Sequence, residues 1–330
     1  MAPTVRVRTG ARLHFGFGNL SLAHERLYGG VGVALEAPET AVRASPADAV
    51  ACEHDRAREY AERACDLLDL PGADVAVQEA LPPHVGLGSG TALALATLAA
   101  VARAHDRAPA VRERAPALGR GGRSGVGVAA FEDGGVVLDA GHPTSRFTTA
   151  PPETGEWTVP AVAARHDVPG DWRFLLVRPA VGEGQSDTAE DESMRAVVRG
   201  ADPALADRVA GAICRRLLPA VAEPDLASFG DAVAAVGRLN GAWYADEQGG
   251  VYRPPVGELV TALAESPAVE GAGQSSWGPT VYGVTDADRA AEAMAAGRDA
   301  LDAAGVAGRV RVVEPANRGA RVERVPDPPG

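Results

Sequence analysis

The most specific chemical signal in this sequence is a glycine-rich segment at residues 82–91, PPHVGLGSGT. It lies between a strand expected around Val75 and Val77 and an apolar helix expected over about 91–105. Glycines let the backbone approach a ligand closely, and a helix N-terminus presents free N–H groups at the positive end of its dipole. The segment therefore predicts an anion site, in which two hydroxyl groups are also candidate ligands of a magnesium ion. The expected phosphate-binding residues are Gly86, Gly88, Ser89, Gly90 and Thr91, with Ser89 and Thr91 as the metal-binding pair.

The alternatives to this anion site are limited by the rest of the chain. A purely structural glycine turn stays open. A P-loop is excluded, because the sequence contains no lysine and all 32 basic residues are arginines. A Rossmann fingerprint is excluded by the glycine spacing and by the lack of a ribose-binding acid after a second strand. A phosphate held by a charged side chain must therefore be held by arginine, which can make a two-pronged contact.

Four arginines in glycine-rich segments are candidates for that contact. Arg12 and Arg26 lie in the first such region, and Arg120 and Arg123 lie in the segment GRGGRSG. The chain carries a net charge of −12, so four arginines in such segments predict a local anion site. The alternative for each is a surface arginine on a turn.

The elements that must position these residues indicate an α+β protein of two domains. A length of 330 residues fits two units, and the composition changes near residue 165, so we expect domains at 1–165 and 166–330. Strands are expected around residues 5–7, 75–77, 136–138, 174–177, 281–284 and 309–313, and helices at about 59–70, 91–105, 188–199, 203–221, 225–240 and 286–304. The stretch 14–32 is expected to interrupt β structure, residues 126–131 fit either a helix or a strand, and the last residues, PDPPG, are expected to fray.

Composition and charge exclude several classes of function. An isoelectric point near 5.1 argues against a nucleic-acid partner. Cys52, Cys65 and Cys214 fit no zinc or redox spacing. The longest apolar run, residues 92–102, is too short to cross a membrane, and the N-terminus has no apolar signal core. We therefore expect a cytoplasmic protein with small-molecule substrates.

The glycine-rich segment resembles the phosphate-binding loop of the GHMP small-molecule kinases, P-x-x-x-G-L-G-S-S/G. Residues 119–135 look like a second kinase segment, and Gly271 to Gly273 fall where these kinases keep a third glycine motif. The resemblance covers nearly the whole chain. It implies an N-terminal domain like ribosomal protein S5 domain 2, a ferredoxin-like C-terminal domain, and a ligand site in the cleft between them.

Two departures from the kinases decide the expected function. Aligned on Ser124 and Gly125, the position where many of these kinases place the aspartate that activates the substrate hydroxyl is Gly127. The third glycine motif is replaced by residues 274–280, QSSWGPT. A phosphate site without the kinase base makes ordinary phosphoryl transfer the weaker interpretation.

The same departures resemble one branch of the superfamily, the β-ribofuranosylaminobenzene 5′-phosphate synthases. The blocks TGARLHFG, RLYGGVG, HVGLGSGT, GRGGRSG, DEQGG and GQSSWGPT carry this resemblance over roughly residues 9–283. It implies condensation of 4-aminobenzoate, or 4-hydroxybenzoate, with phosphoribosyl diphosphate in methanopterin-type cofactor biosynthesis. Diphosphate and carbon dioxide leave, magnesium is the normal cofactor, and a homodimer is implied.

That reaction needs positioning and charge stabilisation more than a strong base, because carbon dioxide rather than a proton leaves the ring. Trp277 is expected either to stack on the aromatic acceptor or to fill the interdomain core. Asp139 and His142 form a polar pair at a strand end, and one acid of residues 187–192 is a candidate magnesium ligand. The expected catalytic residues are His14, Arg123, Glu247 and Gln248. The expected substrate-binding residues beyond the glycine loop are Arg12, Arg26, Arg120, Ser124, Gln274, Ser275, Ser276 and Trp277.

Three other functions stay open at this point. A C-nucleoside synthase would use the same donor with a heteroaromatic carboxylate. A GHMP kinase with a relocated base would form ADP from ATP. A binding protein that retains a phosphate loop would release no diphosphate.

Overall fold

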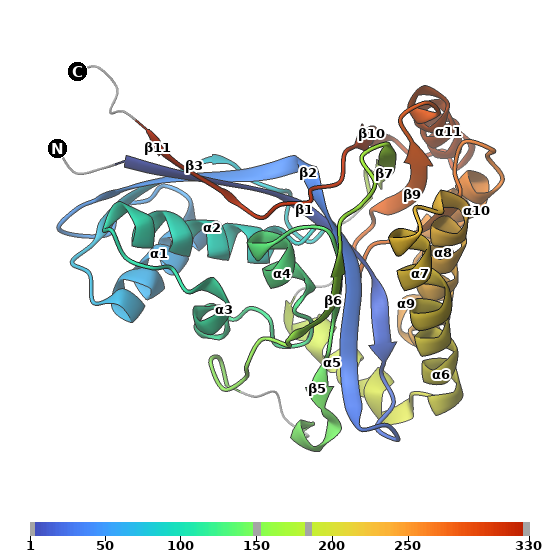
Figure 1. The fold of residues 1–330 in the computed structure, drawn as a ribbon, viewed down its shortest axis with the longest axis horizontal. Helices are drawn as coiled ribbons and strands as arrows, with labels where there is room; N and C mark the ends of the chain where they lie inside the picture. The colour runs from blue at the N-terminus through green and yellow to red at the C-terminus, as the bar shows by residue number, and fades with distance from the viewer. Residues whose placement is uncertain (1–3, 148–152, 182–186, 326–330) are drawn as a thin grey trace.

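A computed structural model describes residues 4–147, 153–181 and 187–325. The chain forms two sheets with helices packed against each (Figure 1). The first sheet has seven strands in the order β11-β1-β2-β4-β6, with β3 and β5 both paired to β2. Their bounds are β1 Thr4–Asn19, β2 Arg26–Pro46, β3 Ala73–Glu79, β4 Val136–Asp139, β5 His142–Pro143, β6 Val162–His166 and β11 Arg321–Val325.

The long hairpin of β1 and β2 corrects one expectation. The glycine-rich stretch 14–32 does not interrupt β structure, because both strands run through it, with irregular pairing between His14 and Gly16. Glycine permits this by close packing: a Cβ on Gly32 would lie 2.2 Å from the carbonyl oxygen of Leu13. The glycines therefore belong to a tightly paired hairpin rather than to a loop.

Helices α1 Asp55–Leu68, α2 Ser89–Ala104, α3 Val111–Arg114 and α4 Val126–Glu132 lie on one side of this sheet (Figure 1). Short 3₁₀ turns follow at Pro116–Leu118 and Thr144–Arg146. Almost every residue of α2 is buried, as its run of alanine and leucine predicts. Residues 126–131, for which the sequence allowed either a helix or a strand, belong to the helix α4.

The second sheet is antiparallel, in the order β10-β7-β9-β8. Its strands are β7 Trp172–Pro179, β8 Gly271–Gln274, β9 Val281–Asp286 and β10 Gly308–Val313. The helices in this half of the chain are α5 Asp187–Gly200, α6 Pro203–Ala212, α7 Leu218–Ala222, α8 Leu226–Trp243, α9 Ala245–Gln248, α10 Val256–Ala264 and α11 Ala290–Ala303, with a π-helical turn at Ile213–Leu217 joining α6 to α7. Helix α10 is not among the helices expected from the sequence, and its nine residues lie between proline-rich and glycine-rich segments.

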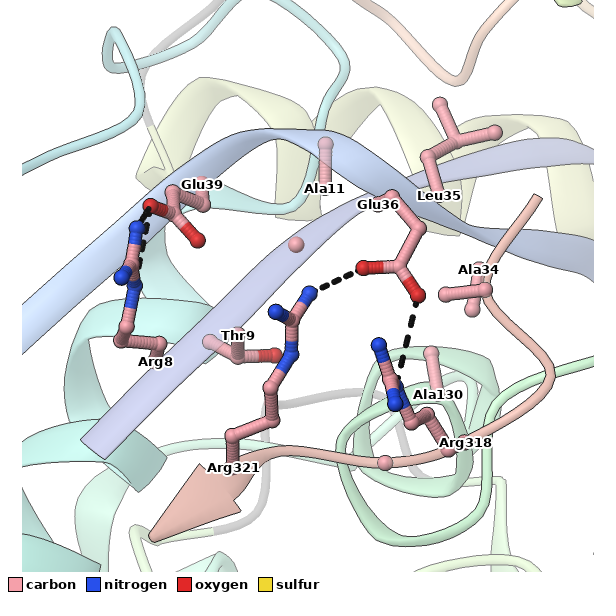
Figure 2. Close-up of a pocket in the computed structure, with 13 residues that line it drawn as sticks. Arg8, Thr9, Ala11, Ala34, Leu35, Glu36, Glu39, Ala130, Arg318 and Arg321 are labelled. Carbon is pink, nitrogen blue, oxygen red and sulfur yellow. Dashed lines mark hydrogen bonds and ion pairs between the residues drawn. The ribbon is translucent and has the colours of Figure 1, made fainter. Parts of the chain in front are cut away.

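The end of the chain returns to the first sheet. The change of sheet falls between β6 and β7, near the expected boundary at 165, but β11 pairs antiparallel with β1. Glu36 on β2 forms ion pairs with Arg318 and Arg321 (Figure 2). The segment that ends in β11 therefore belongs with the first sheet, where it pairs with the edge of β1 that β2 leaves open. The expected frayed end, 326–330, lies outside the described residues.

A continuous apolar cluster joins the two units. Phe15 of β1 packs edge-on against Phe229 of α8, with ring centroids 6.1 Å apart, and against Tyr282 of β9 at 5.1 Å. The ring of Trp172, on β7, packs against that of Phe229 with centroids 4.9 Å apart. This shared core fixes the cleft between the domains. Within the part of the chain that the structure describes, no helix has the length and apolar character needed to cross a membrane.

Candidate active site

The predicted phosphate loop leads directly into α2. Gly86 and Gly88 have φ of 87° and 80°, in the left-handed region that favours glycine. No side chain caps the start of α2, and its first turn carries no acidic residue. Thr91, in that turn, lines a large cleft. The uncapped N–H groups of α2 can therefore accept an anion from the cleft side.

Arginines converge on this cleft. Among the residues that the structure describes, seven arginines and two glutamates line it. The arginines come from β1, α1, the segment before α4, and both sides of the unit boundary: Arg12, Arg56, Arg63, Arg120, Arg123, Arg146 and Arg195. In a chain of net charge −12, this is a concentrated positive site, suited to a polyanionic ligand.

Two of these arginines flank the start of α2. A Cβ on Gly88 would lie 3.0 Å from Cγ of Arg12, and one on Gly90 would lie 2.8 Å from Nη1 of Arg120. Arg12 Nη1 donates to the carbonyl oxygen of Gly86 at 2.7 Å. Arg120 lies over the Tyr60 ring, 5.6 Å from its centroid. Both guanidinium groups are thus held beside the helix N-terminus.

A buried polar chain supports the opposite wall of the cleft. Ser124 Oγ donates to Asp139 Oδ2 at 2.9 Å and lies 3.3 Å from His14 Nε2. Because the serine proton is directed at the aspartate, Nε2 of His14 donates to the serine oxygen. Asp139 also accepts the backbone N–H groups of Gly125 and Gly141, at 2.7 and 2.9 Å.

The charges along this chain are set by burial. Burial, with the nearby charges of Arg12 and Arg123, lowers the pKa of His14 to about 3, so its imidazole is neutral. Burial raises the pKa of Asp139, and the hydrogen bonds to its carboxylate, which lower the pKa, only partly offset this. His14 and Ser124, both predicted from the sequence, are brought together at the cleft. Asp139, noted only as half of a polar pair, is the residue that orients them.

The predicted serine at 275 joins the loops instead of facing the cleft. Ser275 is fully buried; its Oγ donates to the carbonyl oxygen of Gly86 at 2.7 Å and accepts from the backbone N–H of His14 at 3.1 Å. A Cβ on Gly278 would lie 2.1 Å from the nitrogen of Gly86. The neighbouring Ser276, with φ of 54°, lines the cleft.

A smaller pocket adjoins the cleft and shares His14, Phe17 and Ser276 with it. Trp277 lines this pocket, with its ring centroid 4.5 Å from that of Tyr244.

The amides of this smaller pocket bond within the protein. Gln248 Nε2 donates to the Val251 carbonyl at 2.8 Å, and Gln274 bonds to the backbones of Arg253 and Ser276. The predicted Gln248, Gln274 and Trp277 therefore lie together beside the cleft.

Several predicted residues line neither pocket. They are Gly86, Gly88, Ser89 and Gly90 of the predicted phosphate loop, together with Arg26, Glu247 and Ser275. Glu247 is exposed on α9 and lines neither. The guanidinium of Arg26 donates to the carbonyl oxygens of Ala140 and Gly141, and Arg26 is absent from the cleft lining.

Gly127, the position that the sequence alignment gives for the kinase base, lies beside Thr91. A Cβ on Gly127 would lie 3.2 to 3.5 Å from the side chain of Thr91. The backbone is in place but no carboxylate is attached. Glu59 and Glu156 supply the carboxylates that line the cleft within the described residues.

The two residues predicted to bind magnesium offer hydroxyl groups rather than carboxylates. Among the residues that the structure describes, no cluster of three or more His, Cys, Asp or Glu side chains could hold a metal. Of the two hydroxyl ligands predicted from the sequence, Thr91 lines the cleft and Ser89 lines neither pocket. Magnesium commonly keeps several waters and binds through substrate phosphates, so one hydroxyl group beside bound phosphates is compatible with it. The acidic candidates at 187–192 have side chains outside the described residues.

A second charged pocket lies away from this site. It lies around Glu36 and Glu39, where Arg8 pairs with Glu39, and Arg318 and Arg321 pair with Glu36 (Figure 2). Its charges neutralise one another, in contrast to those of the cleft.

Comparison with known families and structures agrees with this architecture. Residues 33–135 match the GHMP kinases N terminal domain, and residues 217–303 match the GHMP kinases C terminal domain. A crystal structure of homoserine kinase from Cytophaga hutchinsonii superposes with a TM-score of 0.67 at 17% identity, covering 98% of each chain. The fold is that of the GHMP kinases.

Curated relatives of the full chain share a different name. The β-ribofuranosylphenol 5′-phosphate synthase of Methanothermobacter thermautotrophicus is 33% identical, over 88% of this chain and 94% of its own. The protein of the same name from Archaeoglobus fulgidus is 31% identical, over 97% of this chain and 99% of its own.

Proposed function

Since this chain belongs to the β-ribofuranosylphenol 5′-phosphate synthase family and has the GHMP kinase fold, we propose that it transfers ribose 5-phosphate from phosphoribosyl diphosphate to a para-substituted benzoate. The acceptor is 4-hydroxybenzoate or 4-aminobenzoate, and the relatives' name, with its phenol, favours the first. Diphosphate and carbon dioxide leave, and the product belongs to methanopterin-type cofactor biosynthesis. The observation that carries the proposal is the arginine-lined cleft at the uncapped start of α2.

The donor is the ligand that best accounts for the charge of the cleft. Phosphoribosyl diphosphate has phosphate groups at both ends of the sugar, more charge than one glycine loop can neutralise. Arg12 and Arg120 beside α2 can hold one end. The other end of the donor can be held by Arg56 and Arg63 of α1 or by Arg123 near His14, which line the same cleft. Guanidinium groups bind such oxygens in pairs of hydrogen bonds.

The chemistry needs charge stabilisation at two places. As the bond from the anomeric carbon to diphosphate breaks, positive charge builds on the sugar and negative charge on the leaving group. The ring carbon that carries the carboxylate forms the new bond to the anomeric carbon. The carbon–carboxylate bond then breaks, its electrons restore the aromatic ring, and carbon dioxide departs. No proton has to be removed from a ring carbon.

The residues of the cleft suit these demands. Arginine side chains can stabilise the departing diphosphate, and neutral His14 can donate or accept a hydrogen bond without adding charge near the sugar cation. Magnesium, held by Ser89 and Thr91 with the phosphates, would add Lewis-acid stabilisation of the leaving group. Most of the rate would come from positioning.

The kinase alternative is less well supported by the same site. Gly127 places no carboxylate beside Thr91, and the buried Asp139 already accepts hydrogen bonds from Ser124, Gly125 and Gly141. A carboxylate so engaged is poorly placed to take a proton from a substrate.

Product analysis tests the proposal. The protein is incubated with magnesium and phosphoribosyl diphosphate, together with 4-hydroxybenzoate or 4-aminobenzoate labelled at the carboxyl carbon. We expect diphosphate, labelled carbon dioxide and a carbon–carbon-linked ribosyl arene 5′-phosphate in equal amounts by mass spectrometry.

Three results would overturn it. A heteroaromatic carboxylate that reacts while both benzoates fail would indicate a C-nucleoside synthase. ADP formed from ATP and a small alcohol would indicate a kinase. Donor binding without diphosphate release under any condition would indicate a binding protein.

A further inference from the structure

An imidazole at the apolar part of the cleft has a buried nitrogen that nothing in the protein uses. His142 lies on β5, paired with Leu27 of β2, and lines the cleft. It is 8% exposed, and within the described residues its Nε2 has no hydrogen-bond partner. Leaving a buried polar atom unpaired is unfavourable, and a bound ligand that pairs with it would recover that cost.

The hydrogen bonding of this imidazole defines what it can offer a ligand. His142 bonds to the backbone of Gly122 in a way that raises its pKa, which means that the ring donates to the carbonyl oxygen. Burial and the charges of Arg146 and Arg26 lower the pKa overall, so the ring is neutral. A neutral imidazole with its proton on Nδ1 carries a lone pair on Nε2, which can accept a hydrogen bond.

The surroundings of His142 suit an aromatic ring. The ring of Tyr28 packs edge-on against that of His142, with centroids 6.4 Å apart, and the ring centroid of Phe17 lies 5.5 Å from that of Tyr28. Leu27, Phe147 and Met194 line the cleft as well. We call Phe17, Leu27, Tyr28, Phe147 and Met194, with His142, the aromatic end of the cleft.

This end is a better site for the acceptor than the pocket at Trp277. Trp277 is already packed on Tyr244, and both glutamines beside it bond within the protein. The aromatic end combines apolar contacts with one unused acceptor. Its charged neighbours, Arg146 and Arg195, also line the cleft, where a benzoate carboxylate would find cations.

We infer, on the basis of the proposed function, that Nε2 of His142 accepts a hydrogen bond from the para-hydroxyl or para-amino group of the acceptor, held at the aromatic end of the cleft. The para group is opposite the reacting carbon, so it points away from the sugar. When the ring attacks, electron density flows from the para group and its hydrogen becomes more acidic. The bond to His142 then strengthens in the transition state, which is the condition for catalysis by hydrogen bonding.

Paired variants and acceptors test this contact. The intact protein is compared with His142→Phe, which lacks the acceptor atom, and with His142→Gln, whose amide oxygen can replace it. Turnover of 4-hydroxybenzoate and 4-aminobenzoate is measured, as are the affinities for phosphoribosyl diphosphate, 4-hydroxybenzoate and 4-methoxybenzoate by calorimetry. Arg120→Ala is the matched control at the donor end.

We expect His142→Phe to lower kcat for 4-hydroxybenzoate by about 30-fold or more and to remove the preference of binding for the hydroxy over the methoxy compound. Donor affinity should stay within about twofold, as for a change remote from the phosphates. His142→Gln should recover part of both losses. Arg120→Ala should show the reverse pattern, with weaker donor binding and an unchanged acceptor preference.

Other results would overturn the inference and are distinct from failure of the proposed function. A loss confined to donor affinity in His142→Phe would place the imidazole on a ribose hydroxyl. A wild-type preference for the hydroxy compound retained in His142→Phe would remove His142 from the acceptor site. If the intact protein forms no ribosyl arene, the proposed function fails, and the calorimetric preference still decides whether His142 contacts the para group.

Discussion

Two glycine-rich segments meet at the cleft, and they use glycine in different ways. At the end of the loop before α2 and in the first turn of that helix, the missing Cβ atoms of Gly88 and Gly90 face the side chains of Arg12 and Arg120. In the segment at 271–278, those of Gly271 and Gly278 face the backbones of Gly230 and of Val85 and Gly86. The first set leaves a helix N-terminus open beside cationic side chains. The second allows two chain segments to touch.

The difference teaches that glycine content alone does not identify a ligand site. Gly86 belongs to both arrangements: its carbonyl accepts from Arg12 and from Ser275, and its Cβ would lie 2.2 Å from the Ser275 carbonyl oxygen. The phosphate loop is therefore held in shape from the other domain. Residues at 275–278 fix the loop, and Thr91, in the first turn of α2, lines the cleft.

The largest expected effect is on stability, and it compares a glycine whose added Cβ would clash with neighbouring backbone with a glycine that only has a positive φ. Gly278→Ala should lower the free energy of unfolding by about 3 kcal/mol or more, because its Cβ would lie within 2.1 Å of backbone atoms of both Val85 and Gly86. Gly249→Ala is the control: φ is 80° there but nothing lies within 4 Å, so a loss of about 1 kcal/mol is expected. Chemical denaturation measures both. Equal losses would mean that the contact between the loops is not tight.

A smaller effect distinguishes arginines in the cleft from those outside it. Arg120→Ala should weaken binding of phosphoribosyl diphosphate by about 10- to 100-fold, the size of a lost charged hydrogen bond of about 1.5–3 kcal/mol. Arg26→Ala should change the affinity by less than about threefold, because Arg26 bonds to the carbonyls of residues 140 and 141. Calorimetry gives both values. Comparable losses of donor affinity in the two variants would indicate that Arg26 also binds the donor.

The smallest effect tests the position of the missing kinase base. Gly127→Asp puts a carboxylate beside Thr91 and should weaken donor binding by about fivefold to tenfold through repulsion of the phosphates. Gly127→Asn has nearly the same shape without the charge and should change it by about twofold at most. The ratio of the two dissociation constants is the measurement. Appearance of ADP formation in the aspartate variant would instead support the kinase alternative.

Much of the fold could be predicted from the sequence because it depends on local patterns. The alternation of Val5 and Val7, the apolar run before His105, and the glycine loop each specify an element without reference to the rest of the chain. The family blocks extended this to the two-domain fold, which the comparisons confirm. The return of β11 to β1 could not be predicted, since a short polar strand has no local signal for its partner.

The candidate site was predictable only in part. Arg12, Arg120, Arg123, His14 and Ser124 do gather at the cleft. The position of Arg26 and the joining role of Ser275 depend on contacts between residues more than 100 positions apart, and the support given by Asp139 depends on a contact across helix α4. Glu247 is exposed on α9 and lines neither pocket. The unused nitrogen of His142 is also visible only when every partner around it is known.

The sequence by itself determined which chemical groups this protein has: arginine as the only strong cation, a glycine loop before a helix, and glycine where a kinase has its base. Residue type and short spacing carry that information. Only the tertiary structure decided which of those groups share a cleft and which are consumed by the protein's own hydrogen bonds. The physical reason is that a polar group is available to a ligand when folding leaves it near other ligand-facing groups and without an internal partner, and both conditions depend on residues distant in the chain.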